Sequence, residues 1–200
     1  MGPLHKPHTA QSQRKSGKSA LTTLAPPAAN VRCGVVIWSD AVLMKFRTEQ
    51  CKTVPMALRY FNVFGPRQDP SSPYSGVISL FAGLAQKGEA ASIFGDGSQT
   101  RDFIYVDDVV RANLLAGDLS ELNQAMVLNV GTGSSVSILE LWESLCHLVG
   151  RELIPPCFLP PREGDVLHSV CDPGRASALL DFRSKIPMEM GLKATLAFLA

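Results

Sequence analysis

The stretch VPMALRYFNVFGP, residues 54–66, decides the fold class. Its first eight residues are mostly apolar, which is typical of a buried parallel strand, and the strand runs into the turn at Gly65-Pro66. A helix is predicted next, over residues 75–87, because apolar residues recur there at helical spacing and Gly88 can end it. A strand followed by an amphipathic helix indicates the start of an α/β alternation.

The same alternation continues along the rest of the chain. Strands are predicted over residues 91–94, 101–106, 125–130 and, as a Pro-interrupted edge segment, 153–159. Helices are predicted from 107 or 108 to about 116, over 137–149, from 172 onward and over about 189–199. Asp107 or Asp108 can cap the first of these helices, Ser137 and Glu140 form a capping box, and Asp172-Pro173 can start a helix. The sequence therefore predicts an α/β fold.

The N-terminal quarter of the chain has a different composition. Residues 1 to about 30 are rich in Ser, Thr, Pro and Ala and contain no acidic residue, which is typical of disorder. Residues 33–38 can form a short strand, but no clear cap or turn bounds it. We therefore expect residues 1–52 to be an unpatterned segment, disordered or aberrant, and residues 53–200 to form the folded part.

Composition excludes several classes of protein. The formal net charge is +1 and the pI about 7.7, so the strongly basic surface of a nucleic-acid-binding protein is not expected. None of the five cysteines lies in a CxxC pair, which argues against a zinc site and favours reduced thiols in a cytoplasmic protein. No apolar run approaches the roughly 20 residues that span a bilayer. We expect no metal, no nucleic acid and no membrane partner.

Five short strings carry a family resemblance. They are LRYFNVFG at 58–65, IFGDG at 93–97, TRDFIYVDD at 100–108, NVGTG at 129–133 and REGD at 162–165. In this order and spacing they resemble the extended short-chain dehydrogenase/reductase family of NAD-dependent epimerases and dehydratases, most closely its UDP-N-acetylglucosamine and UDP-glucuronate 4-epimerases. The resemblance covers about residues 53–199. It implies the last strands of a Rossmann-type parallel sheet and a small mixed α/β substrate-binding domain, without the N-terminal Rossmann half.

The resemblance implies four polar substrate ligands. In the family, Asn62 contacts the phosphates or the sugar, Arg101 and Arg162 hold the diphosphate, and Asp165 binds the ribose hydroxyls. A planar guanidinium can hold phosphate oxygens bidentately, and a carboxylate can accept two hydrogen bonds from a vicinal diol. The residues alone leave other roles open, since Asn62 can end its strand by bonding to backbone and Arg101 can pair with Asp102 at the surface.

The resemblance also implies a pocket for the uracil base. Ser92 and Phe94 match the segment that lines this pocket, where backbone groups read the edge of the base and an aromatic ring covers its face. Gly76 and Val77 match the neighbouring wall. A phenylalanine in a strand is more often plain core, so Phe94 also has a purely structural explanation.

The cofactor implied by the resemblance is NAD, with Tyr60 and Phe61 near the nicotinamide. The family's redox chemistry needs a GxxGxxG turn for the pyrophosphate and a YxxxK pair as the base. Neither motif occurs, since no tyrosine precedes Tyr60 and no glycines stand at that spacing. We therefore expect no catalytic residues in this chain and no turnover by it alone.

The predicted function follows from the anchors that are present. Intact relatives oxidise the sugar at C4, let the 4-keto intermediate rotate, and return the hydride to the opposite face. This chain is expected to be a nucleotide-sugar-binding fragment of such a 4-epimerase, an isomerase that is usually homodimeric. Two alternatives stay open: a 4,6-dehydratase or decarboxylase of the same family, and a non-catalytic nucleotide-sugar-binding fragment.

Overall fold

The computed structural model describes residues 33–35, 54–69, 76–119, 122 and 124–199. Every described residue belongs to one compact unit, which spans residues 32–200. The predictions for residues 1–52 therefore lie outside the described part, apart from strand β1 (Cys33–Val35). β1 falls within residues 33–38, where the sequence allows a short strand.

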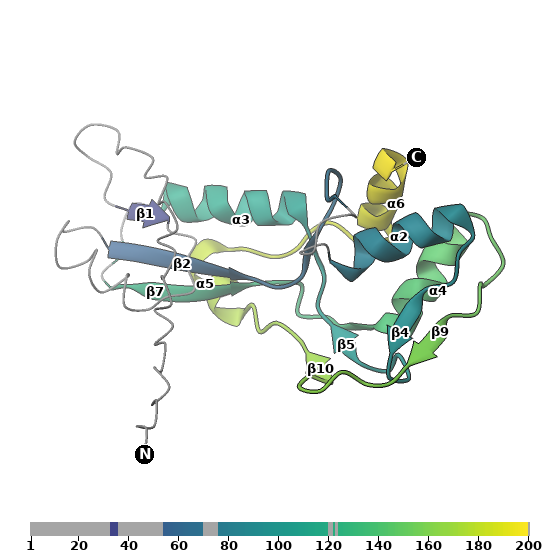
Figure 1. Cartoon of the computed structure of the whole chain (residues 1–200). Helices are drawn as coiled ribbons and strands as arrows, with labels where there is room; N and C mark the ends of the chain where they lie inside the picture. The colour runs from purple at the N-terminus through teal and green to yellow at the C-terminus, as the bar shows by residue number, and fades with distance from the viewer. Residues whose placement is uncertain (1–32, 36–53, 70–75, 120–121, 123, 200) are drawn as a thin grey trace, which may run out of the picture. The chain divides into compact units, whose positions relative to one another are not determined.

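A parallel sheet forms the first half of the described fold (Figure 1). Its strands lie in the order β1, β2 (Val54–Tyr60) and β7 (Met126–Val130), and both neighbouring pairs are parallel. Two helices, α3 (Val106–Asp118) and α5 (Gly174–Leu180), share one hydrophobic core with β2 and β7. Residues 55–58 of β2 are all buried, so both faces of the strand are covered, which explains why its sequence is a nearly continuous apolar run.

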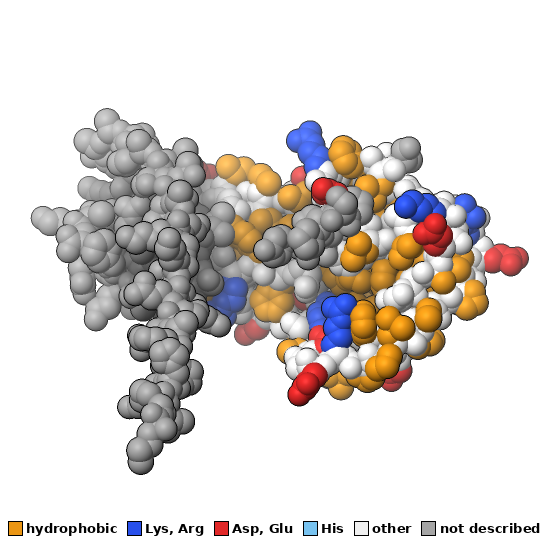
Figure 2. All heavy atoms as spheres, in the orientation of Figure 1, with side chains coloured by type: hydrophobic (Ala, Val, Ile, Leu, Met, Phe, Trp, Pro, Cys, Tyr) orange, Lys and Arg blue, Asp and Glu red, His pale blue; other side chains and the backbone are white. Residues whose placement is uncertain are grey.

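Three helices and one strand form a second hydrophobic core. Its elements are α2 (Val77–Lys87), α4 (Ile138–Leu148), α6 (Met188–Leu199) and β4 (Ser92–Phe94). β4 pairs in parallel with β9 (Cys157–Leu159), and Trp142 of α4 is fully buried with its ring edge-on to Phe81. On the face seen in Figure 2, hydrophobic side chains gather over this part of the fold.

Short strands connect the two cores. β3 (Val63–Phe64) pairs with β6 (Ile104–Tyr105) in parallel, while β5 (Thr100–Arg101) lies between β10 (His168–Ser169) and β8 (Val136–Ser137). The single strand predicted over residues 101–106 is therefore wrong in detail. It is divided into β5 and β6 because the fully buried Asp102 turns inward between them and bonds to loops instead of a neighbouring strand.

Several predicted helix ends are confirmed. Ser137 and Glu140 form the capping box, with Glu140 donating its N–H to the Ser137 hydroxyl at 3.1 Å and accepting from the Ser137 N–H at 2.9 Å. Gly88 ends α2 in the left-handed conformation, at φ 77°. The helix predicted with Asp172 as its N-cap and Pro173 as its first residue begins one residue later, because Pro173 takes the N-cap position and Gly174 is the first residue of α5; the Asp172 carboxylate accepts from the Gly174 N–H. Together with the parallel strands, these elements give the predicted α/β fold.

The predicted cap of α3 is wrong. Tyr105 is in the N-cap position without a side-chain bond, and both Asp107 and Asp108 lie inside the first turn. The buried Asp108 carboxylate instead accepts hydrogen bonds from the backbone N–H groups of Lys185 and Ile186 at 3.0 Å. Asp108 therefore binds backbone groups 77 and 78 residues away, and not the N–H groups of its own helix end. Sequence spacing does not reveal such a distant partner.

Candidate functional site

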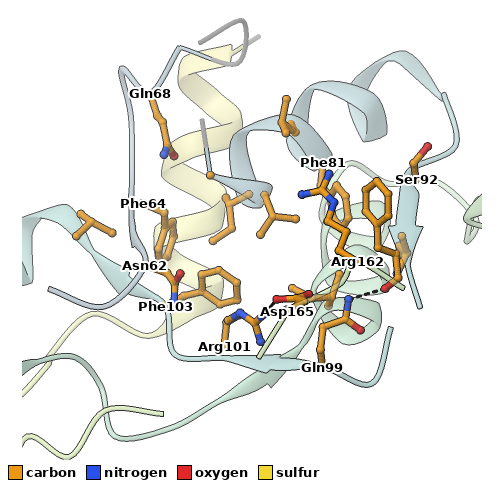
Figure 3. Close-up of a pocket in the computed structure, with 18 residues that line it drawn as sticks. Asn62, Phe64, Gln68, Phe81, Ser92, Gln99, Arg101, Phe103, Arg162 and Asp165 are labelled. Carbon is orange, nitrogen blue, oxygen red and sulfur yellow. Dashed lines mark hydrogen bonds and ion pairs between the residues drawn. The ribbon is translucent and has the colours of Figure 1, made fainter. Parts of the chain in front are cut away.

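A cavity of about 550 Å³ lies beside the ends of β3, β4 and β5 (Figure 3). Its lining comes from segments that are far apart in the sequence, around residues 62–68, 76–81, 92–103 and 162–165. Every residue predicted to contact the substrate lines this one cavity: Asn62, Gly76, Val77, Ser92, Phe94, Arg101, Arg162 and Asp165. The fold therefore brings together residues that the sequence spreads over about half of the chain.

Arg101 and Asp165 point toward each other in the cavity (Figure 3). The guanidinium Nη2 of Arg101 donates to Asp165 Oδ1 at 2.5 Å, and Nη1 donates to the carbonyl oxygen of Thr100 at 2.9 Å. The Arg101 side chain is 17% exposed and that of Asp165 is 40% exposed. The surface pair of Arg101 with Asp102, left open by the sequence, is not formed. Asp165 takes that place.

Arg162 lies across the ring of Phe94. Its guanidinium carbon is 3.7 Å from the ring centroid, which is a close cation–π contact. Phe94 itself is held by its backbone, because Gln99 Nε2 donates to its carbonyl oxygen at 2.8 Å. Arg162 also borders a second, more apolar cavity of about 700 Å³, whose lining includes Phe158 and Val166. The Arg162 side chain is thus a shared wall between the two cavities.

Asn62 follows β2 and has a side-chain contact with the backbone. The side-chain Nδ2 of Asn62 donates to the backbone carbonyl of Asp102 at 2.7 Å. The backbone carbonyl of Asn62 accepts from the Ile104 N–H at 3.2 Å. This is the structural role that the residue type alone suggested. The side chain is nevertheless exposed in the cavity, and its second N–H has no partner among the described residues.

The buried carboxylate of Asp102, next to Arg101, ties together two loops outside the cavity lining. Asp102 is fully buried and accepts hydrogen bonds from the Thr132 N–H and hydroxyl, the Gly133 N–H and the Cys171 N–H. Gly131 is required beside it, because a Cβ there would lie 2.4 Å from the Cβ of Cys171. The sequence did not reveal this role, because every partner of the Asp102 carboxylate lies at least 30 residues further along the chain.

The thiol of Cys171 is buried near the carboxylates of Asp102 and Asp172. Burial first, and then the negative charges of Asp102 and Asp172, raise its pKa to about 12. A thiol at such a pKa is protonated at neutral pH and is a poor nucleophile. Cys171 therefore contributes packing beside Asp102 and no covalent chemistry.

Two glutamines line the cavity that the sequence reasoning did not single out. Gln68 follows the Gly65-Pro66 turn, and its buried Oε1 has no hydrogen-bond partner among the described residues. Gln99 holds the carbonyl of Phe94. Both lie a few residues outside the strings that carried the resemblance, which explains why they were overlooked.

The residues predicted to approach NAD, Tyr60 and Phe61, line neither of the two cavities. The Tyr60 hydroxyl donates to Asn113 Oδ1 of α3 at 2.9 Å, and burial raises the pKa of Tyr60 more than this bond lowers it. The Phe61 N–H donates to the carbonyl of Val130. Their polar groups are thus used inside the fold.

The described part of the chain contains neither a metal-binding cluster nor a membrane-spanning helix. Its His, Cys, Asp and Glu side chains form no group that could hold a metal ion. None of its helices is both long and apolar enough to cross a membrane.

Several known proteins are similar to this chain in sequence and in fold. Residues 37–131 match the NAD dependent epimerase/dehydratase family. The UDP-glucose 4-epimerase of Mycolicibacterium smegmatis is 40% identical over 137 residues, which are 68% of this chain and 42% of that protein. The structure of the Thermotoga maritima UDP-glucose 4-epimerase with UDP-glucose has a TM-score of 0.72 and 39% identity, covering 79% of this chain and 50% of that chain.

A third relative was solved with its cofactor. The UDP-glucuronic acid 4-epimerase of Bacillus cereus, in complex with UDP-glucuronic acid and NAD, has a TM-score of 0.71 and 28% identity, covering 79% of this chain and 49% of that chain. The present chain spans about half the length of these relatives. Its parallel strands match the C-terminal portion of their Rossmann-type fold. Over the residues matched, the chain belongs to the NAD dependent epimerase/dehydratase family.

Proposed function

We propose that the cavity lined by Arg101 and Arg162 binds a UDP-sugar, and that the chain supplies the nucleotide-sugar-binding part of a 4-epimerase. The observation that carries this proposal is the convergence of the predicted substrate ligands on one cavity. A volume of about 550 Å³ falls in the range of ordinary small-molecule sites. The T. maritima and B. cereus relatives were each solved with a UDP-sugar, which supports the same class of ligand.

Each side chain of the cavity suits a different part of the ligand. The guanidinium groups of Arg101 and Arg162 border the same cavity and offer positive charge and planar donors to a diphosphate. Asp165 offers a carboxylate to a ribose diol, and the ring of Phe94 offers a face for the base. The second N–H of Asn62 can donate to a phosphate or a sugar hydroxyl. A nucleotide held at these points stays fixed while the sugar beyond it can turn.

The redox step is not assigned to this chain. The sequence contains no YxxxK pair and no GxxGxxG turn, and Tyr60 and Phe61 use their polar groups within the fold. We infer that the chain binds the substrate without oxidising it. The residues of this chain therefore act only by binding and positioning the substrate. A dehydratase or decarboxylase of the family would use the same anchors, so the binding proposal covers these alternatives too.

The test is a calorimetric titration of the purified chain. We expect UDP-glucose, UDP-N-acetylglucosamine or UDP-glucuronate to bind more tightly than dTDP-glucose or GDP-mannose. Arg101→Gln should weaken binding about tenfold, since it removes a charge-assisted contact. Arg175→Gln is the matched control, because it removes an equal charge from an exposed position on α5.

Three results would count against the proposal. Absence of binding by any nucleotide sugar would remove the site altogether. Equal losses in Arg101→Gln and Arg175→Gln would show that general charge, and not this cavity, holds the ligand. NAD-dependent interconversion of UDP-sugars by the chain alone would contradict the statement that it lacks the redox step.

A further inference from the structure

Both arginines of the cavity already have partners inside the site. Arg101 holds the carboxylate of Asp165 at 2.5 Å, and the Arg162 guanidinium lies 3.7 Å from the Phe94 ring centroid. Each of these four groups is also one that we propose for binding the ligand. Their contacts with one another therefore compete with the contacts that the ligand would make.

The competition at Arg101 is between two anions. A diphosphate that takes the Arg101 Nη2 N–H now bonded to Asp165 must displace the carboxylate, since both groups are acceptors for that donor. The displaced carboxylate then lies beside the phosphates with no compensating positive charge or donor. Like charges at close range oppose binding unless one of them finds a new partner.

A second competition has the same form at Phe94. A guanidinium 3.7 Å from the ring centroid leaves no room for a planar base on that face of the ring. Because Arg162 lies in the same short turn as Asp165, which donates its N–H to the Arg162 carbonyl at 3.2 Å, both contacts depend on one loop. Displacement of one side chain therefore favours displacement of the other.

We propose that Asp165 determines specificity as an internal competitor for Arg101. A nucleoside diphosphate replaces both halves of the ion pair, because its phosphates bind Arg101 while its ribose diol donates to the released carboxylate. Inorganic pyrophosphate replaces only one half and leaves Asp165 unpaired next to an anion. The site thereby rejects free phosphate and pyrophosphate, although its arginines suit them. This inference rests on the proposed function, since it uses the same cavity and ligand class.

The ion pair between Asp165 and Arg101 should change the affinity for pyrophosphate by a measurable factor. Asp165 is partly exposed, so solvent and salt screen its pair with Arg101. An exposed pair of this kind contributes up to about 1 kcal/mol, which corresponds to about a fivefold change in affinity. The contribution should shrink as the salt concentration rises.

The experiment compares pyrophosphate and UDP on three proteins: wild type, Asp165→Asn and Glu163→Gln. Glu163→Gln removes the same charge from the same loop, but Glu163 is exposed and does not line the cavity. We expect Asp165→Asn to bind pyrophosphate about fivefold more tightly than wild type at low salt, while Glu163→Gln changes less than twofold. The UDP affinity of Asp165→Asn should fall, because the partner of its ribose is lost.

Other outcomes overturn the inference. A gain in pyrophosphate affinity that is equal in Asp165→Asn and Glu163→Gln would reflect net charge alone. Failure of Asp165→Asn to bind pyrophosphate at millimolar concentration would show that Arg101 was not held back by Asp165. The proposed function fails separately: if UDP does not bind wild type but Asp165→Asn still gains pyrophosphate, the competitor is real and the assigned ligand is wrong.

Discussion

Asp102 holds Thr132 through one carboxylate oxygen, which accepts from the Thr132 N–H at 3.0 Å and from its hydroxyl at 2.7 Å. The other oxygen accepts from the N–H groups of Gly133 and Cys171. One buried side chain thus ties the segment after β5 to the turn after β7 and to the chain that enters α5. Since Arg101 is the preceding residue, this network also fixes the position of the Arg101 backbone.

Replacement of this carboxylate should destabilise the protein strongly. In Asp102→Asn the amide NH₂ would face backbone donors, and at least one buried N–H would lose its acceptor. We expect a loss of about 2–3 kcal/mol in the free energy of unfolding, measured with urea. Asp96→Asn, in an exposed turn, should change the free energy of unfolding far less. Similar losses in the two variants would mean that burial of Asp102 is not what matters.

The cysteines should differ in reactivity. Cys171 is buried with its pKa raised to about 12, whereas Cys157 is exposed on β9. Iodoacetamide at pH 8.5, followed by peptide mass spectrometry, should label Cys157 much faster, because the thiolate is the reacting form. In denaturant the rates should converge. Equal rates in the native protein would contradict the burial of Cys171.

The same thiol makes stability depend on alkaline pH. In the unfolded chain a cysteine loses its proton near pH 8.5, while folded Cys171 keeps it to about pH 12. Between these values the folded state binds more protons, so the free energy of unfolding falls as pH rises. Replacement by Ala should remove this part of the alkaline decline in urea titrations.

Two helix glycines should respond in opposite directions to alanine. A Cβ at Gly191 of α6 would lie 2.7 Å from Tyr105 Cδ2 and 2.9 Å from the Phe64 ring, so Gly191→Ala should cost about 1–3 kcal/mol. A Cβ at Gly83 of α2 meets nothing within 4 Å, so Gly83→Ala should stabilise by about 0.5–1 kcal/mol. Thermal melts of both variants check the signs. A stabilised Gly191→Ala would show that α6 packs less closely.

The capping box should contribute in a pH-dependent way. Ser137→Ala should cost about 1 kcal/mol at pH 7, whereas Ser135→Ala, at an exposed position two residues earlier, should cost little. Hydrogen bonds from Ser137 lower the pKa of Glu140, so the carboxylate stabilises the fold above the usual carboxyl range. That stabilisation is lost as pH falls through the lowered pKa. Urea unfolding at pH 7 and near pH 3 should therefore give a smaller Ser137→Ala effect in acid.

Local patterns predicted the fold well because they depend on neighbours in the chain. Apolar periodicity gave α2, α4 and α6 within one or two residues, and the capping box of Ser137 lies within one helical turn. The candidate site was also reachable from the sequence, since each of its short strings keeps its own pattern. What a string cannot show is the partner that another string supplies.

The details that were missed all involve such partners. Arg101 and Asp165 are 64 residues apart, and nothing near either one announces their contact. Asp108 looks like a helix cap until the backbone of Lys185, 77 residues away, binds it. The buried role of Asp102 depends on the turn after β7 and on Cys171. Long-range side-chain pairing depends on packing, and packing is decided by the whole fold.

A crystal structure of the chain with UDP-glucose tests the central claim most directly. We predict a diphosphate in the cavity within hydrogen-bond distance of both the Arg101 and the Arg162 guanidinium groups. The ribose should lie on Asp165 and the base over Phe94. A ligand bound elsewhere on the protein, or within the cavity but in contact with neither arginine, would contradict the proposal that this cavity is the nucleotide-sugar site.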